Sequence, residues 1–188
     1  MIISLCGTPG VGKTTVAKML SKQGWAVIDL KEFLSSSGLF KVDRVTGELI
    51  VDVDIARDHL KDELTDLKSD IIIEGHLSYL APWDLCIVMR LHPAEVKERL
   101  SERDYPTSKL EENVEAEVVG TILVEAVREG DENRERSVLE LDCKGLDEEQ
   151  CCEKVSHLIR CSQAKRLNEL RQYSPGSVDW LEVMDEWY

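Results

Sequence analysis

The segment from Gly7 to Thr15, GTPGVGKTT, has the residue types and the spacing of a phosphate-binding loop. Gly7, Gly12, Lys13 and Thr14 fit the pattern G-x-x-x-x-G-K-[ST]. Glycines allow successive backbone N–H groups to converge on phosphate oxygens, because no Cβ blocks the approach. The lysine supplies a mobile positive charge for the β- and γ-phosphates, and the threonine hydroxyl can bind Mg²⁺. The loop therefore predicts a nucleoside triphosphate with Mg²⁺ as its ligand.

Charged side chains also follow other apolar segments that we expect to form strands. Ligands of an open parallel sheet bind outside the carboxyl ends of its strands, and these ends supply Asp29, Glu74, His76 and Arg90. The run IIIE is typical of a strand that delivers a carboxylate beside a metal, so we expect Glu74 to hold Mg²⁺ through a water molecule. His76 follows two residues later, which favours a role in the reaction over a hydrogen bond to a backbone carbonyl.

Arg99 and Arg103 lie four residues apart in a predicted helix and would share one of its faces. They can reach a nucleotide, or they can form a solvated basic stripe beside Glu98 and Glu102, and the residues alone leave both possibilities open.

The elements that must position these side chains alternate along the chain. Strands are expected at 1–6, 25–28, 70–73, 85–91 and 137–142, and helices at 13–22, 30–38, 54–67, from 93 onward, 109–129 and 147–172. Asp52 and Asp54 are candidate ribose ligands or caps, with Asp54 favoured as the N-cap of the helix that begins there. The alternation predicts an α/β fold with a five-stranded parallel sheet flanked by helices.

Composition limits the classes of function. The formal charge of −14 disfavours a general nucleic-acid binder; it permits a basic protein partner or serves solubility alone. The chain of 188 residues suits one domain over 1–188, without a signal-peptide pattern or a run of ~20 apolar residues. Its six cysteines show no C-x-x-C spacing and no zinc pattern, which indicates a reducing, cytoplasmic location.

Two further blocks, IIIEGHLSYLAP and ERLSERDYPTSKLEENVEAE, accompany the loop, and the tail contains tryptophan. With these blocks the chain resembles, over about residues 1–185, the small atypical adenylate kinases. This family, also described as ribosome-assembly ATPases, occurs in archaea and in the eukaryotic nucleus (the coilin-interacting nuclear ATPase type), and the archaeal form is the more similar. Glu74 and His76 occupy the Asp-x-His positions of the family, with glutamate in place of aspartate and Gly75 in place of a bulky residue.

The resemblance implies a three-layer P-loop NTPase fold of the nucleoside monophosphate kinase type, and it implies roles for particular residues and segments. Segment 30–53 would be the monophosphate-binding insert, 102–112 the lid that carries Arg103 to ATP, and 173–188 a C-terminal tail. The expected ATP ligands are Gly10, Gly12, Lys13, Thr14, Thr15 and Arg103. The expected catalytic residues are Lys13, Glu74, His76 and Arg103, and the candidate AMP contacts are Asp29, Asp52 and Arg90.

The expected reaction is ATP + AMP ⇌ 2 ADP, with slow ATP hydrolysis when a water near His76 replaces AMP as the acceptor. The resemblance also implies a role in assembly of the small ribosomal subunit, with the basic ribosomal protein S11 (universal scheme) as partner. The alternative is a small-metabolite kinase of the shikimate type, which generally needs an arginine-lined carboxylate site. Segment 30–80 contains only Arg44 and Arg57, so this alternative ranks last.

Overall fold

The computed structural model describes residues 1–188 except 43–48, 66–68, 104–105, 132–136 and 183–188. Its main sheet has five parallel strands in the order β2-β5-β1-β6-β7. These strands are β1 (Ile2–Cys6), β2 (Ala26–Asp29), β5 (Ile71–Glu74), β6 (Leu85–Arg90) and β7 (Ser137–Asp142). All residues of β1, β5 and β6 are buried, as expected for parallel strands covered on both faces. The five-stranded parallel sheet flanked by helices is thus confirmed.

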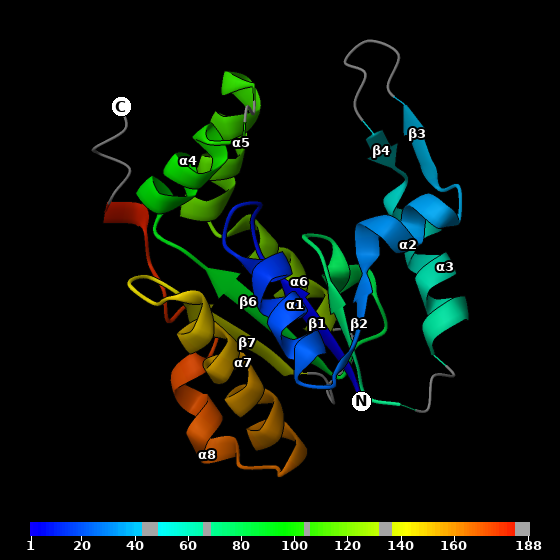
Figure 1. The fold of residues 1–188 in the computed structure, drawn as a ribbon, viewed down its shortest axis with the longest axis vertical. Helices are drawn as coiled ribbons and strands as arrows, with labels where there is room; N and C mark the ends of the chain where they lie inside the picture. The colour runs from blue at the N-terminus through cyan, green and yellow to red at the C-terminus, as the bar shows by residue number, and fades with distance from the viewer. Residues whose placement is uncertain (43–48, 66–68, 104–105, 132–136, 183–188) are drawn as a thin grey trace.

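Helices cover both faces of this sheet (Figure 1). One hydrophobic cluster joins Ile87 of β6 to α1 (Lys13–Lys22) and α7 (Glu148–Gln163). The other cluster joins the next residue, Val88, to α3 (Val53–Leu64) and α6 (Thr121–Asp131). Neighbouring residues of one strand therefore enter different cores, which explains why these strands are continuous apolar runs.

Two groups of elements project beyond the carboxyl ends of the strands, on either side of the loop between β1 and α1 (Figure 1). One group contains α2 (Leu30–Ser36) and a hairpin of β3 (Phe40–Val42) and β4 (Leu49–Val51), which occupies most of the expected monophosphate insert. The other contains α4 (Pro93–Ser101) and α5 (Thr107–Val118), and the expected lid spans their junction. Part of each predicted segment, residues 43–48 and 104–105, lies outside the described residues. The remaining elements are short: η1 (Ser78–Leu80), α8 (Leu167–Leu170) and η2 (Arg171–Tyr173).

Two of the long predicted helices are wrong, because each is interrupted by a residue with positive φ. The helix expected over 109–129 is divided at Gly120, which has a φ of 68°. A Cβ at this position would lie 3.2 Å from Arg90 Nη1, so glycine also allows that side chain to approach. The helix expected over 147–172 ends at Gln163, and Lys165 follows with a φ of 54°.

The N-cap predicted for α3 is also wrong by two residues. Asp52 precedes the helix, and its Oδ1 accepts hydrogen bonds from the N–H groups of Asp54 (3.2 Å) and Ile55 (3.3 Å). Asp54 lies inside the first turn, where its negative charge is favourable near the positive end of the helix dipole.

Within the described part of the chain, no helix combines the length and the apolar character needed to span a membrane.

Candidate functional site

The predicted phosphate-binding loop connects β1 to α1, at the carboxyl edge of the sheet. Gly7 has a φ of 139°, and a Cβ there would lie 2.3 Å from the carbonyl oxygen of Met89, so no other residue fits. Gly12, with a φ of 105°, is the N-cap of α1 and offers no side chain to cap the first N–H groups. The N-terminus of α1 therefore keeps backbone donors and the positive end of its dipole available for an anion.

The side chain of Lys13 reaches back to the loop that precedes it. Its Nζ donates a hydrogen bond to the carbonyl oxygen of Thr8 at 2.9 Å, and the residue is buried. Burial lowers the pKa of Lys13 to about 8, while the nearby carboxylate of Glu74 opposes that shift. The ammonium group has thus lost much of its hydration, and a phosphate would restore a favourable partner.

Glu74 at the end of β5 meets Thr14 in the first turn of α1. The Thr14 hydroxyl donates to Glu74 Oε1 at 3.1 Å. Burial raises the pKa of Glu74, and the negative charge of Asp29 on the neighbouring strand adds to this shift. A hydroxyl and a carboxylate oxygen side by side are ligands that Mg²⁺ prefers, and a cation would offset the repulsion between the two acids. The residues present therefore fit Mg²⁺.

His76 follows Gly75, which, like Glu74, departs from the pattern of the family that the chain resembles. Gly75 has a φ of 152°, and a Cβ there would lie 3.0 Å from Leu30 Cβ, so this backbone favours glycine. His76 is exposed at the edge of the site. Even so, loss of solvation by the surrounding protein, followed by the positive charge of Lys13, lowers the pKa of His76 to about 4. The imidazole is consequently neutral at pH 7 and can accept a proton or a hydrogen bond.

The two candidate arginines of α4 lie near the loop in different ways. Arg99 Nη1 donates a hydrogen bond to the carbonyl oxygen of Gly10 at 3.3 Å. Arg103 is exposed just beyond the helix, and its positive charge contributes to the lowered pKa of Lys13. Arg99 therefore contacts the loop directly, whereas Arg103 influences Lys13 through its charge.

Asp29 and Asp52 both accept hydrogen bonds from the first turns of helices. Asp29 Oδ1 accepts from the N–H of Glu32 at 3.0 Å, at the start of α2, and Asp52 caps α3. Both residues are exposed, so capping leaves their carboxylates accessible to solvent. A contact of either residue with AMP stays a prediction.

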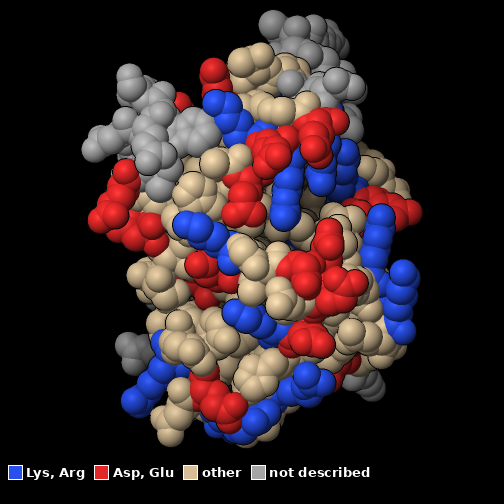
Figure 2. Space-filling view, turned by 60° about the vertical axis from the view of Figure 1, so that its left-hand side comes forward, with Lys and Arg blue, Asp and Glu red and all other residues tan. Residues whose placement is uncertain are grey.

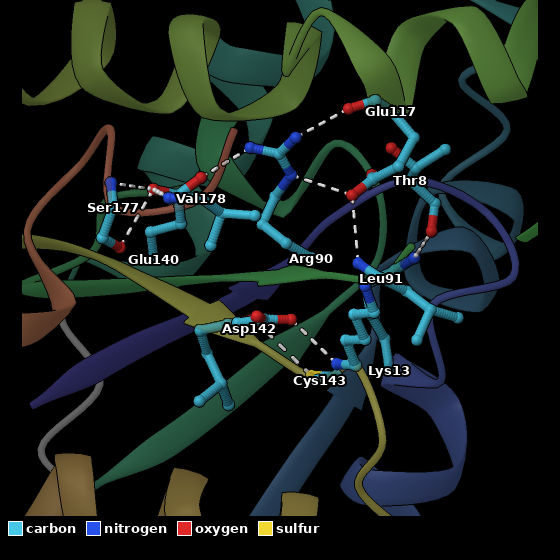
Figure 3. A network of polar contacts seen from close by, with 12 residues as sticks. Thr8, Lys13, Arg90, Leu91, Glu117, Glu140, Asp142, Cys143, Ser177 and Val178 are labelled. Atoms are coloured by element: carbon cyan, nitrogen blue, oxygen red, sulfur yellow. Dashed lines mark hydrogen bonds and ion pairs between the residues drawn. The ribbon is translucent and has the colours of Figure 1, made fainter. Parts of the chain in front are cut away.

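The structure does not present Arg90 as a free guanidinium (Figure 3). Arg90 is 3% exposed, its Nε donates to Glu117 Oε1 at 2.8 Å, and its Nη1 donates to Glu140 Oε1. Its Nη2 donates to the backbone oxygen of Glu117 at 2.6 Å. An AMP contact would have to break this buried ion-pair network, so the geometry assigns Arg90 a positioning role.

Sequence reasoning missed Glu117 and Glu140, the partners of that arginine. Glu117 Oε1 also accepts from the N–H of Leu91 at 3.0 Å, and a side-chain hydrogen bond from Thr8 connects this carboxylate to the phosphate-binding loop. The signal in the sequence is weak, because each acid lies between apolar neighbours in a short run that contains one other acid, VEAEVV for Glu117 and SVLELD for Glu140.

Glu140 extends the network to the tail. Its Oε2 accepts hydrogen bonds from the N–H groups of Ser177 (2.8 Å) and Val178 (3.1 Å). Trp180 follows and is buried, with its ring 5.1 Å from that of His92 in an edge-on contact. The described part of the tail therefore packs onto the domain, and Met184, Asp185, Glu186 and Trp187 lie outside the described residues.

Comparison with known proteins gives consistent similarities. A family model described as "AAA domain" matches residues 3–120. A protein of Pyrococcus abyssi named "Putative adenylate kinase" is 40% identical over 187 residues, which cover 99% of this chain and 94% of the relative. A protein of Methanosarcina barkeri with the same name is 36% identical over 188 residues, covering 98% of this chain and 100% of the relative.

Solved structures with a similar fold are more distant in sequence. The thymidylate kinase of Candida albicans has a TM-score of 0.53 at 14% identity, with coverage of 86% of this chain and 92% of that one. The shikimate kinase of Bacteroides thetaiotaomicron has a TM-score of 0.52 at 16% identity, with coverage of 85% and 98%. At such identities the likeness shows the P-loop kinase fold alone.

Proposed function

Because the chain belongs to the AAA-domain family, together with the archaeal relatives named as adenylate kinases, we propose that it is a nucleoside monophosphate kinase. The reaction is ATP + AMP ⇌ 2 ADP. One observation carries the proposal: Lys13, Thr14 and Glu74 come together at the open N-terminus of α1, where a triphosphate and its metal need them.

On the ATP side, the protein supplies positive charge and backbone donors. The N–H groups of the loop and of the first turn of α1 bind the β-phosphate, and Lys13 leaves the carbonyl of Thr8 to contact the transferring group. Arg99 supports the loop through Gly10, and Arg103, at the junction of α4 and α5, moves toward the phosphates as segment 102–112 closes. Closure excludes water and strengthens each of these charge contacts.

On the acceptor side, segment 30–53 holds AMP, with Asp29 and Asp52 as its polar contacts. Both carboxylates lie at helix starts that border this segment, which supports the assignment. His76 is neutral near pH 7 and lies two residues after Glu74, so it can orient the attacking oxygen. With a pKa of about 4 it is a weak general base, and its main contribution is orientation.

Thr14 and, through water, Glu74 would hold Mg²⁺. The ion supplies charge neutralisation of the phosphates when it is bound. The site is already arranged for the ion: the Glu74 carboxylate is buried beside the loop, and the Thr14 hydroxyl orients one of its oxygens.

A shikimate-type activity has less support. Among the described residues of segment 30–80, the available arginine is Arg57, and it forms ion pairs with Asp54 (2.8 Å) and Glu129. Arg44 lies outside the described residues. A carboxylate substrate would therefore lack a free guanidinium in the described part of this region.

We further propose that the protein hydrolyses ATP slowly and takes part in assembly of the small ribosomal subunit, as the resemblance to the ribosome-assembly ATPases suggests. The proposed location is the cytoplasm. A formal charge of −14 favours a basic partner such as ribosomal protein S11 over bare RNA. Figure 2 shows acidic and basic side chains intermingled on one face, so attraction by that face would be distributed over many small contacts. Leu181, 56% exposed, offers an apolar contact beside the docked Trp180.

A nucleotide screen tests the kinase assignment. Purified protein is incubated with ATP, Mg²⁺ and each of the common nucleoside monophosphates in turn, and ADP formation is measured against a reaction without acceptor. We expect AMP to accelerate ADP formation most strongly. Equal rates with and without every monophosphate would leave only the hydrolase activity.

A further inference from the structure

Three side chains of different chemistry converge where α7 meets α8, in a part of the chain that the proposed reaction does not use. His157 Nε2 lies 3.3 Å from Cys161 Sγ, which lies 3.5 Å from Glu169 Oε2. The third side of this triangle, from His157 Nε2 to Glu169 Oε2, measures 3.6 Å. His157 and Cys161 share one face of α7 because they are four residues apart, and the turn at Lys165 brings Glu169 of α8 against them.

These separations match one face of a tetrahedral metal site. Zinc binds imidazole nitrogen and carboxylate oxygen at about 2.0–2.2 Å and thiolate sulfur at about 2.3 Å. In tetrahedral geometry, bonds of these lengths place neighbouring ligand atoms about 3.3–3.7 Å apart. All three measured distances lie in or at the edge of that range. Cys161 Sγ also lies 3.9 Å from His157 Nδ1, so the imidazole would have to turn about its side-chain bonds to direct Nε2 at the ion, while the helices can stay in place.

We propose that His157, Cys161 and Glu169 form a binding site for Zn²⁺, with water as the fourth ligand. Imidazole and thiolate select zinc over Mg²⁺, which prefers oxygen ligands alone. On binding, the Cys161 thiol loses its proton to solvent as the metal–sulfur bond forms, so no other reactant is required.

The surroundings support a built site. Arg166 Nη1 donates to Glu169 Oε1 at 3.1 Å and to Oε2 at 3.4 Å, which orients the carboxylate, and Oε2 also lies 3.5 Å from Cys161 Sγ. Cys161 is fully buried, whereas the side chains of His157 and Glu169 are each 43% exposed and leave a route for the ion. Burial and the hydrogen bond to Glu169 raise the pKa of the Cys161 thiol, and the positive charges of Arg166 and Arg160 partly oppose that rise.

Zinc bound at this site would stabilise the folded C-terminal segment. Leu170, next to Glu169, belongs to the hydrophobic cluster on the α1–α7 face, and η2 and the docked tail follow it. An ion bound between α7 and α8 would therefore fasten the C-terminal segment to the domain. Figure 1 shows α8 at the end of the molecule remote from α4 and α5, which separates this site from the nucleotide site.

Cobalt titration tests the proposal with a readout specific to thiolate. Protein without a histidine tag is stripped with chelator, dialysed and titrated with Co²⁺. We expect one equivalent to produce a thiolate-to-cobalt charge-transfer band and intense tetrahedral d–d bands, both removed by one equivalent of Zn²⁺. Cobalt bound only by the oxygens of the nucleotide site cannot produce the charge-transfer band.

Four variants test whether the three proposed ligands bind the ion. Cys161→Ser should remove the charge-transfer band, and His157→Gln or Glu169→Gln should weaken Co²⁺ binding at least about 10-fold. Glu153→Gln removes an exposed carboxylate from the same helix and should leave binding unchanged. Because Cys161 is buried, its variant can fail to fold, whereas the two exposed ligands can be replaced in a folded protein. Absence of the band in folded wild-type protein, or the same affinity in Glu169→Gln as in wild type, would overturn the proposal.

Thermal unfolding gives a second, independent measurement. Zn²⁺ at 100 times its dissociation constant should add about 2.7 kcal/mol to the free energy of unfolding, and so raise the melting temperature of wild-type protein. Glu169→Gln should lose that rise at the same zinc concentration, while Glu153→Gln keeps it. An equal rise in all three proteins would place the zinc elsewhere and contradict the site.

Discussion

The hydroxyl of Thr14 lies 3.1 Å from a carboxylate oxygen of Glu74, although 60 residues separate them in the chain. The contact exists because β1 and β5 are neighbours in the parallel sheet, so the loop after one strand meets the end of the other. It places a metal-binding hydroxyl, a buried acid and the loop lysine in one small region.

Glu74→Gln should raise the Mg²⁺ concentration that gives half-maximal ADP formation, because the amide keeps the hydrogen bond to Thr14 but loses the charge that attracts the ion. The measurement is a magnesium titration at saturating ATP and AMP. Glu63→Gln, an exposed acid of α3, serves as the matched control. An unchanged magnesium curve for Glu74→Gln would exclude this carboxylate from the metal site.

Lys13→Ala should reduce ADP formation by on the order of 10²-fold or more, because a charge contact at the transition state is lost. Stability should change little, since the buried ammonium donates one hydrogen bond, to the carbonyl of Thr8, and its desolvation already lowers its pKa. Steady-state kinetics and thermal melting are measured on the same preparation. Near-normal turnover in a folded Lys13→Ala protein would contradict the assigned role.

The lowered pKa of Lys13, about 8, predicts a pH dependence. The free protein loses this positive charge as the pH rises through about 8, so kcat/KM for ATP should fall above that pH. Between about pH 8 and the ordinary lysine value of 10.5, the unfolded chain holds a proton that the folded protein has released, and this term makes stability rise with pH. A profile that stays flat to pH 10 would place the pKa of Lys13 near its ordinary value.

Much of the fold could be predicted from the sequence because its signals are local. The glycine loop and the apolar runs that end in Asp29 and Glu74 identify the sheet edge on which the candidate site lies. The interruptions of the helices at Gly120 and Lys165 could not be predicted in this way, because the hydrophobic periodicity continues across both turns. Only the three-dimensional structure shows that Gly120 packs beside a buried arginine.

The partners of Arg90 depend on long-range pairing, and this explains why the sequence suggested an AMP contact instead. An arginine at a strand end is equally suited to a phosphate or to two buried carboxylates, and Glu117 and Glu140 lie 27 and 50 residues further on. The cluster of His157, Cys161 and Glu169 was missed for a similar reason. Its ligands span a helix, a left-handed turn and a second helix, a spacing that matches no short zinc motif.

Arg90→Ala should destabilise the protein by about 3–5 kcal/mol, because it leaves two buried carboxylates without their partner. Denaturant unfolding measures the loss. Arg128→Ala, at an exposed position of α6, should stay within about 0.5 kcal/mol of wild type. If Arg90→Ala is as stable as wild type and instead raises the KM for AMP, then Arg90 binds substrate.

His76→Ala should slow ATP hydrolysis by ~10-fold or more while the KM for ATP changes little, because the imidazole orients the attacking oxygen on the acceptor side. Replacement of an exposed side chain should leave the melting temperature near that of wild type. His59→Ala, on α3, removes a second imidazole as a control. A hydrolysis rate equal to wild type would assign His76 a structural role only.

The measurement that tests the central claim most directly is the stoichiometry of nucleotide conversion by the purified protein with Mg²⁺. Wild-type protein should convert one ATP and one AMP into two ADP, with release of inorganic phosphate far slower than formation of ADP, and Lys13→Ala should lose this activity. Consumption of ATP with equimolar release of phosphate, at a rate that no nucleoside monophosphate increases, would contradict the kinase assignment.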